Sequence, residues 1–185
     1  MPNPWDERPW AAVGEKSEND IFVAVGKALS HWELVEHAVA GLFTLVTVGT
    51  YFAPSAPVLR AYSSVGSTGT RIQLVRAALE GRLLEWKNCP LGGNALSLLN
   101  ECGGWSARRN DIAHGLADRF ADEYDRGWFL IPGIYSKRGR NEQGKVDYRY
   151  NAKIVDEFGA RFLDLHNRLN ETISAMGEWR RIAVG

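Results

Sequence analysis

The sequence predicts an all-α fold: an antiparallel four-helix bundle with a β-hairpin inserted before the last helix. Two observations support this prediction. Four long segments place apolar residues three and four positions apart, which is the period of an amphipathic helix. A further segment, at about 127–150, instead contains residue types that favour strands on both sides of a basic turn.

The composition is that of an ordinary globular domain. The chain has 185 residues, of which 45% are apolar and 24% charged. Basic and acidic residues both total 22, so we do not expect the chain to coat nucleic acid, and only a local patch could hold RNA. No apolar run is long enough for a membrane span and no secretory signal is apparent, so we expect a cytoplasmic protein without a membrane partner. Cys89 and Cys102 form no metal or redox motif and are expected to be reduced, buried thiols.

The first half of the chain predicts an N-terminal arm and two helices. Residues 1–17 contain two tryptophans and three prolines, and we expect an arm that either packs by its tryptophans or stays mobile. One helical domain is predicted for 18–180. Its first helix covers about 18–49, and the only polar residue on the apolar face is Glu36. The predicted inward residues are Phe22, Val25, Leu29, Trp32, Glu36, Val39, Phe43 and Val46. After a proline-containing break and a Ser/Gly/Thr connector, a second helix covers about 70–87.

The third predicted helix, at about 92–121, has Arg109 as the polar member of its apolar face. The inward residues are Leu91, Ala95, Leu98, Cys102, Trp105, Arg109, Ile112 and Leu116. We expect Gly103 and Gly104 to kink or interrupt this helix, since each costs about 1 kcal/mol relative to alanine. If the helix restarts there, Ser106 is a plausible N-cap, and Arg109 falls in a first turn whose amides favour a phosphate.

The last third of the sequence predicts the hairpin and the final helix. Residues 128–131 and 146–150 are the expected strands, and 137–145 form a basic turn between them. The final helix is expected at about 151–178.

The run from Arg109 to Gly115 carries the strongest functional signal. Asn110 and His114 are four residues apart, so they share one face of a helix, and Arg109 lies beside them. Together they supply a permanent cation, an amide, and a side chain that titrates near neutral pH. Proton transfer beside a phosphate requires about this set of groups.

This run resembles the R-x4-H signature of the HEPN superfamily, helical domains that include RNA-cleaving toxins and defence proteins. Trp32 and Glu36 match the W-x-x-x-E pattern found on the first helix of similar sequences. The resemblance implies a four-helix bundle with the motif at its third helix. It also implies RNA cleavage without a metal or other cofactor, and a symmetric homodimer that combines two motifs in one cleft.

The roles implied are specific to each residue. His114 would transfer the proton of the RNA 2′-hydroxyl or of the leaving oxygen, and Arg109 would stabilise the charge on the phosphate. Asn110 would hold His114 or the phosphate in place. Glu36 is the expected partner of Arg109, either as support for the site or as a structural core pair.

The neighbouring charged residues have more than one interpretation. Asp111 could adjust the electrostatic environment of Arg108 or of His114, or it could favour the start of a helix as an acidic residue of the first turn. Arg108 could contact phosphate or be a solvated surface arginine. The basic hairpin tip could grip RNA or serve solubility alone; its residues are Lys137, Arg138, Arg140 and Lys145.

Two other interpretations of the whole chain compete with the endoribonuclease. One is a non-catalytic HEPN module that dimerises or binds a nucleotide or a partner protein, and the other is a helical scaffold with a structural Arg109–Glu36 pair. For the endoribonuclease, the expected setting is a toxin or antiviral defence factor with an antitoxin or defence-system partner.

Overall fold

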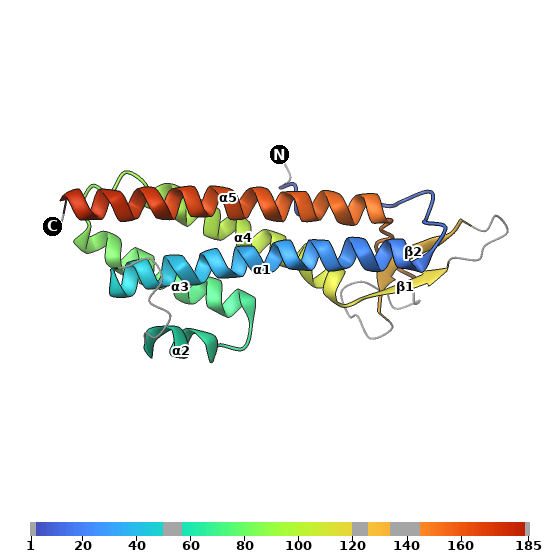
Figure 1. Cartoon of the computed structure of the whole chain (residues 1–185), viewed down its shortest axis with the longest axis horizontal. Helices are drawn as coiled ribbons and strands as arrows, with labels where there is room; N and C mark the ends of the chain where they lie inside the picture. Colours follow the sequence, from blue (N-terminus) through green and yellow to red (C-terminus); the bar gives the residue numbers. More distant parts are fainter. Residues whose placement is uncertain (1–2, 50–56, 120–125, 134–144, 184–185) are drawn as a thin grey trace. The chain divides into compact units, whose positions relative to one another are not determined.

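The protein is mainly helical, with a two-stranded antiparallel hairpin before the last helix (Figure 1). We analysed a computed structural model, which describes residues 3–49, 57–119, 126–133 and 145–183. Its described elements are α1 (Glu18–Val48), α2 (Pro57–Ser63), α3 (Thr68–Glu85), α4 (Gly92–Ala113), β1 (Gly115–Arg119), β2 (Trp128–Pro132) and α5 (Ala152–Ala183). The four predicted long helices are therefore present, and α2 is an additional short helix. None of the described helices has the length and apolarity needed to cross a membrane.

The chain divides into two compact units. The first unit comprises Met1–Trp32 and Ala107–Phe162, and the second comprises Glu33–Ser106 and Leu163–Gly185. The three long helices α1, α4 and α5 each contribute residues to both units. The Arg109–Gly115 motif belongs to the first unit.

At the start of α1 the buried face is offset by one residue from the predicted face, whereas the predicted Trp32, Val39, Phe43 and Val46 are buried. Phe22 was expected inside but is 53% exposed, whereas Ile21, Ala24 and Ala28 are buried. The reason lies in the packing of α1 against α5. A Cβ atom on Gly159 would lie only 3.2 Å from the Ala28 Cα, so the two helices approach closely and small residues must face each other.

The hairpin differs from the predicted one in its first strand. The strand β2 was predicted, but it pairs with β1 and not with residues 146–150. The sequence had placed the residues of β1 in the third helix, which in the structure ends at Ala113. Leu116, predicted to be inward, is 45% exposed. Gly115 explains the change, since a Cβ atom there would lie 2.7 Å from the Leu130 side chain and 2.9 Å from the Asp111 carbonyl oxygen. The glycine permits β2 to pack against the end of α4.

Residues 146–150 contribute single bridges rather than the second hairpin strand that the sequence predicted. Tyr150 exchanges backbone hydrogen bonds with Leu130 at 2.8 and 2.9 Å, and Arg149 forms a bridge with Trp10 of the N-terminal arm. The Arg149 guanidinium lies between the rings of Trp10 and Phe129, 4.8 and 4.5 Å from their centroids. The arm is therefore packed, partly through one of its tryptophans.

In the second unit, α4 passes through its two adjacent glycines without interruption, contrary to the predicted break. Ser106 donates to the Gly103 carbonyl at 2.7 Å within the helix and is not an N-cap. A Cβ on Gly103 would meet no atom within 4 Å, so its backbone has no steric reason to bend. Cys102 is buried, while Cys89, also expected to be buried, is only partly so.

Candidate active site

Arg109 and Asn110 lie in the last turns of α4, and His114 is the turn residue between the end of α4 and the start of β1. Because α4 is continuous, the motif occupies a helix C-terminus, and the predicted placement in a first turn is wrong. The expected stabilisation of phosphate by first-turn amides is thereby lost. Asn110 and His114 are exposed, and the His114 amide donates to the Asn110 carbonyl at 3.1 Å. Their common helix face is therefore open to solvent among the described residues.

Of the two adjacent arginines, Arg108 is buried and Arg109 is only partly buried, the opposite of what the sequence predicted. Arg109 was predicted on the apolar face but is only partly buried, whereas Arg108 is 5% exposed. The solvated-surface interpretation of Arg108 is therefore wrong. A buried arginine requires a counter-charge, because its desolvation costs several kcal/mol.

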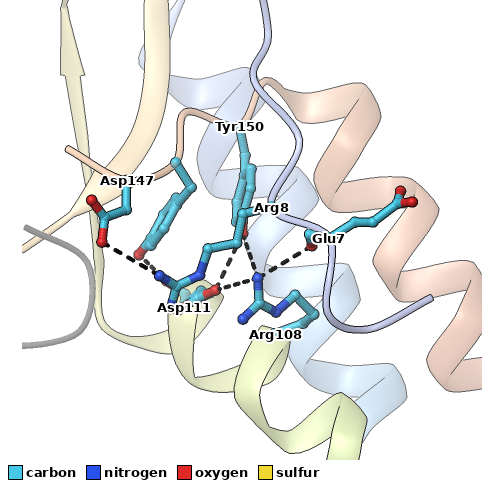
Figure 2. A network of polar contacts seen from close by, with 7 residues as sticks. Glu7, Arg8, Arg108, Asp111, Asp147 and Tyr150 are labelled. Carbon is cyan, nitrogen blue, oxygen red and sulfur yellow. Dashed lines mark hydrogen bonds and ion pairs between the residues drawn. The ribbon is translucent and has the colours of Figure 1, made fainter. Parts of the chain in front are cut away.

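Asp111 supplies that counter-charge (Figure 2). Its carboxylate lies 3.2 Å from Nη1 of Arg108 and accepts the Tyr150 hydroxyl hydrogen bond, also at 3.2 Å. The same Arg108 Nη1 lies within hydrogen-bonding distance of the Tyr150 hydroxyl, at 3.4 Å, and of the Glu7 carbonyl, at 3.3 Å. Of the interpretations left open for Asp111, the structure supports pairing with Arg108.

The N-terminal arm and the segment before α5 complete this network. Arg8 of the arm lies 3.5 Å from Asp111 and 3.6 Å from Asp147, and its guanidinium is 5.7 Å from the centroid of the Tyr148 ring. The Tyr148 hydroxyl donates to the Asp111 backbone carbonyl at 3.0 Å. This bond satisfies one of the carbonyls that the end of α4 leaves without a helical partner. The last turn of the motif helix is therefore fixed from the side that carries Asp111.

Burial controls the protonation of the groups in the network. It raises the pKa of Asp111 above its ordinary value, and the neighbouring arginines and Tyr150 oppose that effect only in part. Burial, and secondly the Asp111 charge, also raises the pKa of Tyr150. Tyr150 is therefore a neutral hydrogen-bond donor at physiological pH.

Arg109 has no such counter-charge among the described residues. Its Nη1 donates to the Asn110 side-chain oxygen at 3.2 Å, and its buried Nε has no hydrogen-bond partner. Glu36, the predicted partner, instead accepts hydrogen bonds in the second unit from Arg71 at 2.9 Å and Thr68 at 2.7 Å. Arg109 therefore has no acidic partner in the described part of the chain. Its unpartnered Nε does not distinguish it from Arg108, whose buried Nε also has no hydrogen-bond partner.

The other predicted residues add little to this site. Lys137, Arg138 and Arg140 lie outside the described residues, and Lys145 is exposed. His31 is half-buried, and its Nδ1 donates to the Gly159 carbonyl at 2.9 Å. Within the described part of the chain, no cluster of three or more His, Cys, Asp or Glu residues could hold a metal ion.

We found no family model, no curated protein and no solved structure that matches this chain.

Sequence reasoning missed Arg8, Tyr148 and Tyr150 as neighbours of the motif. All three lie at least 37 residues from Asp111 in the sequence. One available signal was the Tyr-x-Tyr spacing at 148–150, which placed two hydroxyl-bearing rings in a segment that sequence analysis treated only as a strand.

Proposed function

We propose that this protein is a metal-independent endoribonuclease of the HEPN type, with a four-helix HEPN fold and a catalytic centre at the end of α4. One observation carries the proposal. Of two adjacent arginines, Arg108 is paired with Asp111, whereas Arg109 has no acidic partner among the described residues and bonds the exposed Asn110 of the same motif. A structural arginine would be expected to have a counter-charge, whereas an arginine that binds phosphate must leave that position for its substrate.

The reaction requires no group beyond the side chains and the RNA. His114 accepts the proton of a ribose 2′-hydroxyl, whose oxygen forms a bond to the adjacent phosphorus while the bond from phosphorus to the 5′-oxygen breaks. The leaving 5′-oxygen takes up a proton from a protonated histidine. Arg109 stabilises the charge that develops on the phosphate oxygens, and Asn110 orients Arg109 through the hydrogen bond between them. The products are a 2′,3′-cyclic phosphate and a 5′-hydroxyl.

This mechanism limits the substrate to RNA and requires two copies of the chain. DNA lacks the 2′-hydroxyl and is not cleaved. One chain supplies a single motif histidine, so we propose a homodimer that provides one histidine as base and the other as acid. Cleavage of cellular RNA by such an enzyme would suit a toxin or antiviral defence factor, controlled by an antitoxin or another component of the same system.

Cleavage of a fluorescently labelled RNA by purified protein in EDTA tests the proposal. His114→Ala and Arg109→Ala should each lower the cleavage rate by at least about 10²-fold. His37→Ala and Arg161→Ala are matched controls, since both residues are exposed and lie outside the motif. Equal cleavage by wild type and His114→Ala would contradict the proposal, as would cleavage of the matching DNA.

A second candidate function is a non-catalytic HEPN module that binds a nucleotide or a partner protein. The balance of 22 basic and 22 acidic residues favours it, because most proteins that bind RNA strongly carry an excess of basic charge. This alternative predicts wild-type protein that binds a ligand at the motif without cleaving RNA.

A further inference from the structure

Strand β1 has one edge that no described residue pairs with. In the β1–β2 register, Ala117 lies opposite Leu130. Leu130 uses its backbone N–H and C=O to bond Tyr150 on the other side of β2. Opposite residues in an antiparallel ladder point their backbone groups either toward each other or both away, so the groups of Ala117 point away from β2.

The outward groups of β1 belong to alternate residues, Gly115, Ala117 and Arg119. The N–H of Arg119 is already occupied, because it donates to the Asp118 side chain at 2.8 Å. Gly115 and Ala117 therefore supply the free donors of this edge within the described chain. Between them lies Leu116, an exposed apolar side chain. An open strand edge of this kind is a template for pairing with another strand.

We propose that the β1 edge pairs antiparallel with β1 of a second copy of this chain, about a two-fold axis at Leu116. This inference rests on the proposed function only where it concerns catalysis. With the axis at Leu116, Gly115 of each protomer exchanges hydrogen bonds with the partner's Ala117. The exposed Leu116 side chain then packs against the partner's Leu116 and leaves water.

The other symmetric registers fit the strand less well. An axis at Ala117 would require the Arg119 N–H to bond the partner subunit, although that group is already bonded to Asp118. An axis at Asp118 would place two carboxylates directly opposite each other, which is repulsive. The Leu116 register uses both free donors and places no like charges opposite one another.

This register gives the proposed active site a residue from the second protomer. Because Gly115 pairs with the partner's Ala117, the preceding residue, His114, lies opposite the partner's Asp118. A carboxylate beside a catalytic histidine fixes the orientation of its ring, as in other proton-transfer sites. Asp118 is then a positioning residue, and the site is incomplete in a single chain.

Sedimentation velocity between about 1 and 100 μM, without RNA, tests the pairing. Ala117→Pro removes an outward N–H but no β1–β2 bond, so the variant should be monomeric where wild type and Ala117→Ser are dimeric. A circular dichroism melt as cooperative as that of wild type would show that Ala117→Pro is folded. Wild type that is monomeric throughout, or folded Ala117→Pro that dimerises as wild type does, would overturn the proposal.

A charge exchange at Leu116 tests the register and does not depend on the proline variant. Leu116→Glu and Leu116→Lys should each be monomeric, because each variant places like charges opposite one another across the axis. Their equimolar mixture should form a heterodimer, since Glu then faces Lys. A mixture that stays monomeric while wild type dimerises would overturn the Leu116 register.

The catalytic consequence has its own readout. Asp118→Asn should keep the dimer and the KM for RNA but lower kcat by about tenfold or more, and Asp118→Glu should restore part of the loss. An unchanged kcat in Asp118→Asn would overturn the positioning role. A wild-type dimer without ribonuclease activity, dissociated by Ala117→Pro, would support the paired edge and contradict the proposed function. An active wild-type dimer that folded Ala117→Pro leaves intact would do the reverse, and an active monomer would overturn both.

Discussion

Arg108 and Arg109 are adjacent in the sequence but lie in different environments. Both occupy the last turns of α4, yet Arg108 is held by Asp111, Tyr150 and the arm, whereas Arg109 bonds Asn110 and has no acidic partner among the described residues. The spacing in the sequence was enough to select Arg109, Asn110 and His114 as candidates. Their environments were not, because the depth of each side chain depends on contacts with residues more than 35 positions away.

The first prediction concerns these two arginines. Arg108→Ala should lower the free energy of unfolding by about 3 kcal/mol or more, because it leaves the Asp111 carboxylate in a largely buried site without its main counter-charge. Arg109→Ala should change stability far less while abolishing RNA cleavage, since Arg109 has no ion pair among the described residues to lose. Urea unfolding of both variants measures the difference. Equal losses of stability would show that Arg109 is also a structural residue.

The second prediction concerns pH. Burial raises the pKa of Asp111 above its usual 3.8 in the folded protein. The folded state then binds the proton more tightly than the unfolded state, so the Asp111 contribution to stability is complete below about pH 3.8 and is lost as the pH rises through the raised value.

The stability of wild type relative to Asp111→Asn should therefore fall with increasing pH across that window. Urea unfolding of both proteins from pH 3.5 upward provides the measurement, and the asparagine variant cancels the contributions of all other titrating groups. A relative stability that rises with pH would mean that the arginines outweigh burial at this carboxyl.

At the scale of elements, helical periodicity predicted the four long helices, but it could not predict where α4 ends. Leu116 continues the three–four spacing of apolar residues, so the pattern extends beyond Ala113 into β1. The close approach of Leu130 to Gly115 is a tertiary contact that no local pattern contains. The error of one residue in the buried face at the start of α1 also comes from a tertiary contact. The close approach of Gly159 on α5 to Ala28 places the alanines of α1 in the interface.

The third prediction compares glycines in the middle of helices. Gly26→Ala in α1 and Gly103→Ala in α4 should each raise the free energy of unfolding by about 0.5–1 kcal/mol, since alanine favours a helix and the added Cβ meets no atom within 4 Å. Gly159→Ala should lower it, because its Cβ would lie 3.2 Å from the Ala28 backbone. Thermal unfolding of the three variants separates helix propensity from packing. A stabilised Gly159→Ala would mean that α1 and α5 can separate at no cost.

At the scale of the molecule, the charge balance limits how the protein can bind RNA. A chain with equal numbers of basic and acidic residues has no general attraction for phosphate, so the proposed binding of RNA would depend on the few cations at the candidate site. This property was fully available from composition.

The fourth prediction follows from that balance. Binding of single-stranded RNA by the inactive His114→Ala variant should weaken only modestly with salt. The slope of log K against log [salt] should have a magnitude of about 1–3, as expected for two to four phosphate contacts. Fluorescence anisotropy at several salt concentrations measures it. A magnitude near 6 would indicate an extended basic surface and would favour RNA binding by the hairpin tip.

The pairing of the N-terminal arm with the segment before α5 has a consequence for synthesis of the chain on the ribosome. Ala11 and Arg149, which bond each other, are 138 residues apart, an interval of roughly 10 seconds at ordinary translation rates. Both units also include residues of α5, the last helix to be made. Neither unit can therefore reach its final structure during translation of the earlier segments. Throughout that time Trp10 of the arm lacks Arg149, and Ala28 and Trp32 of α1 lack their partners on α5, so these apolar side chains are available to a chaperone bound at the ribosome.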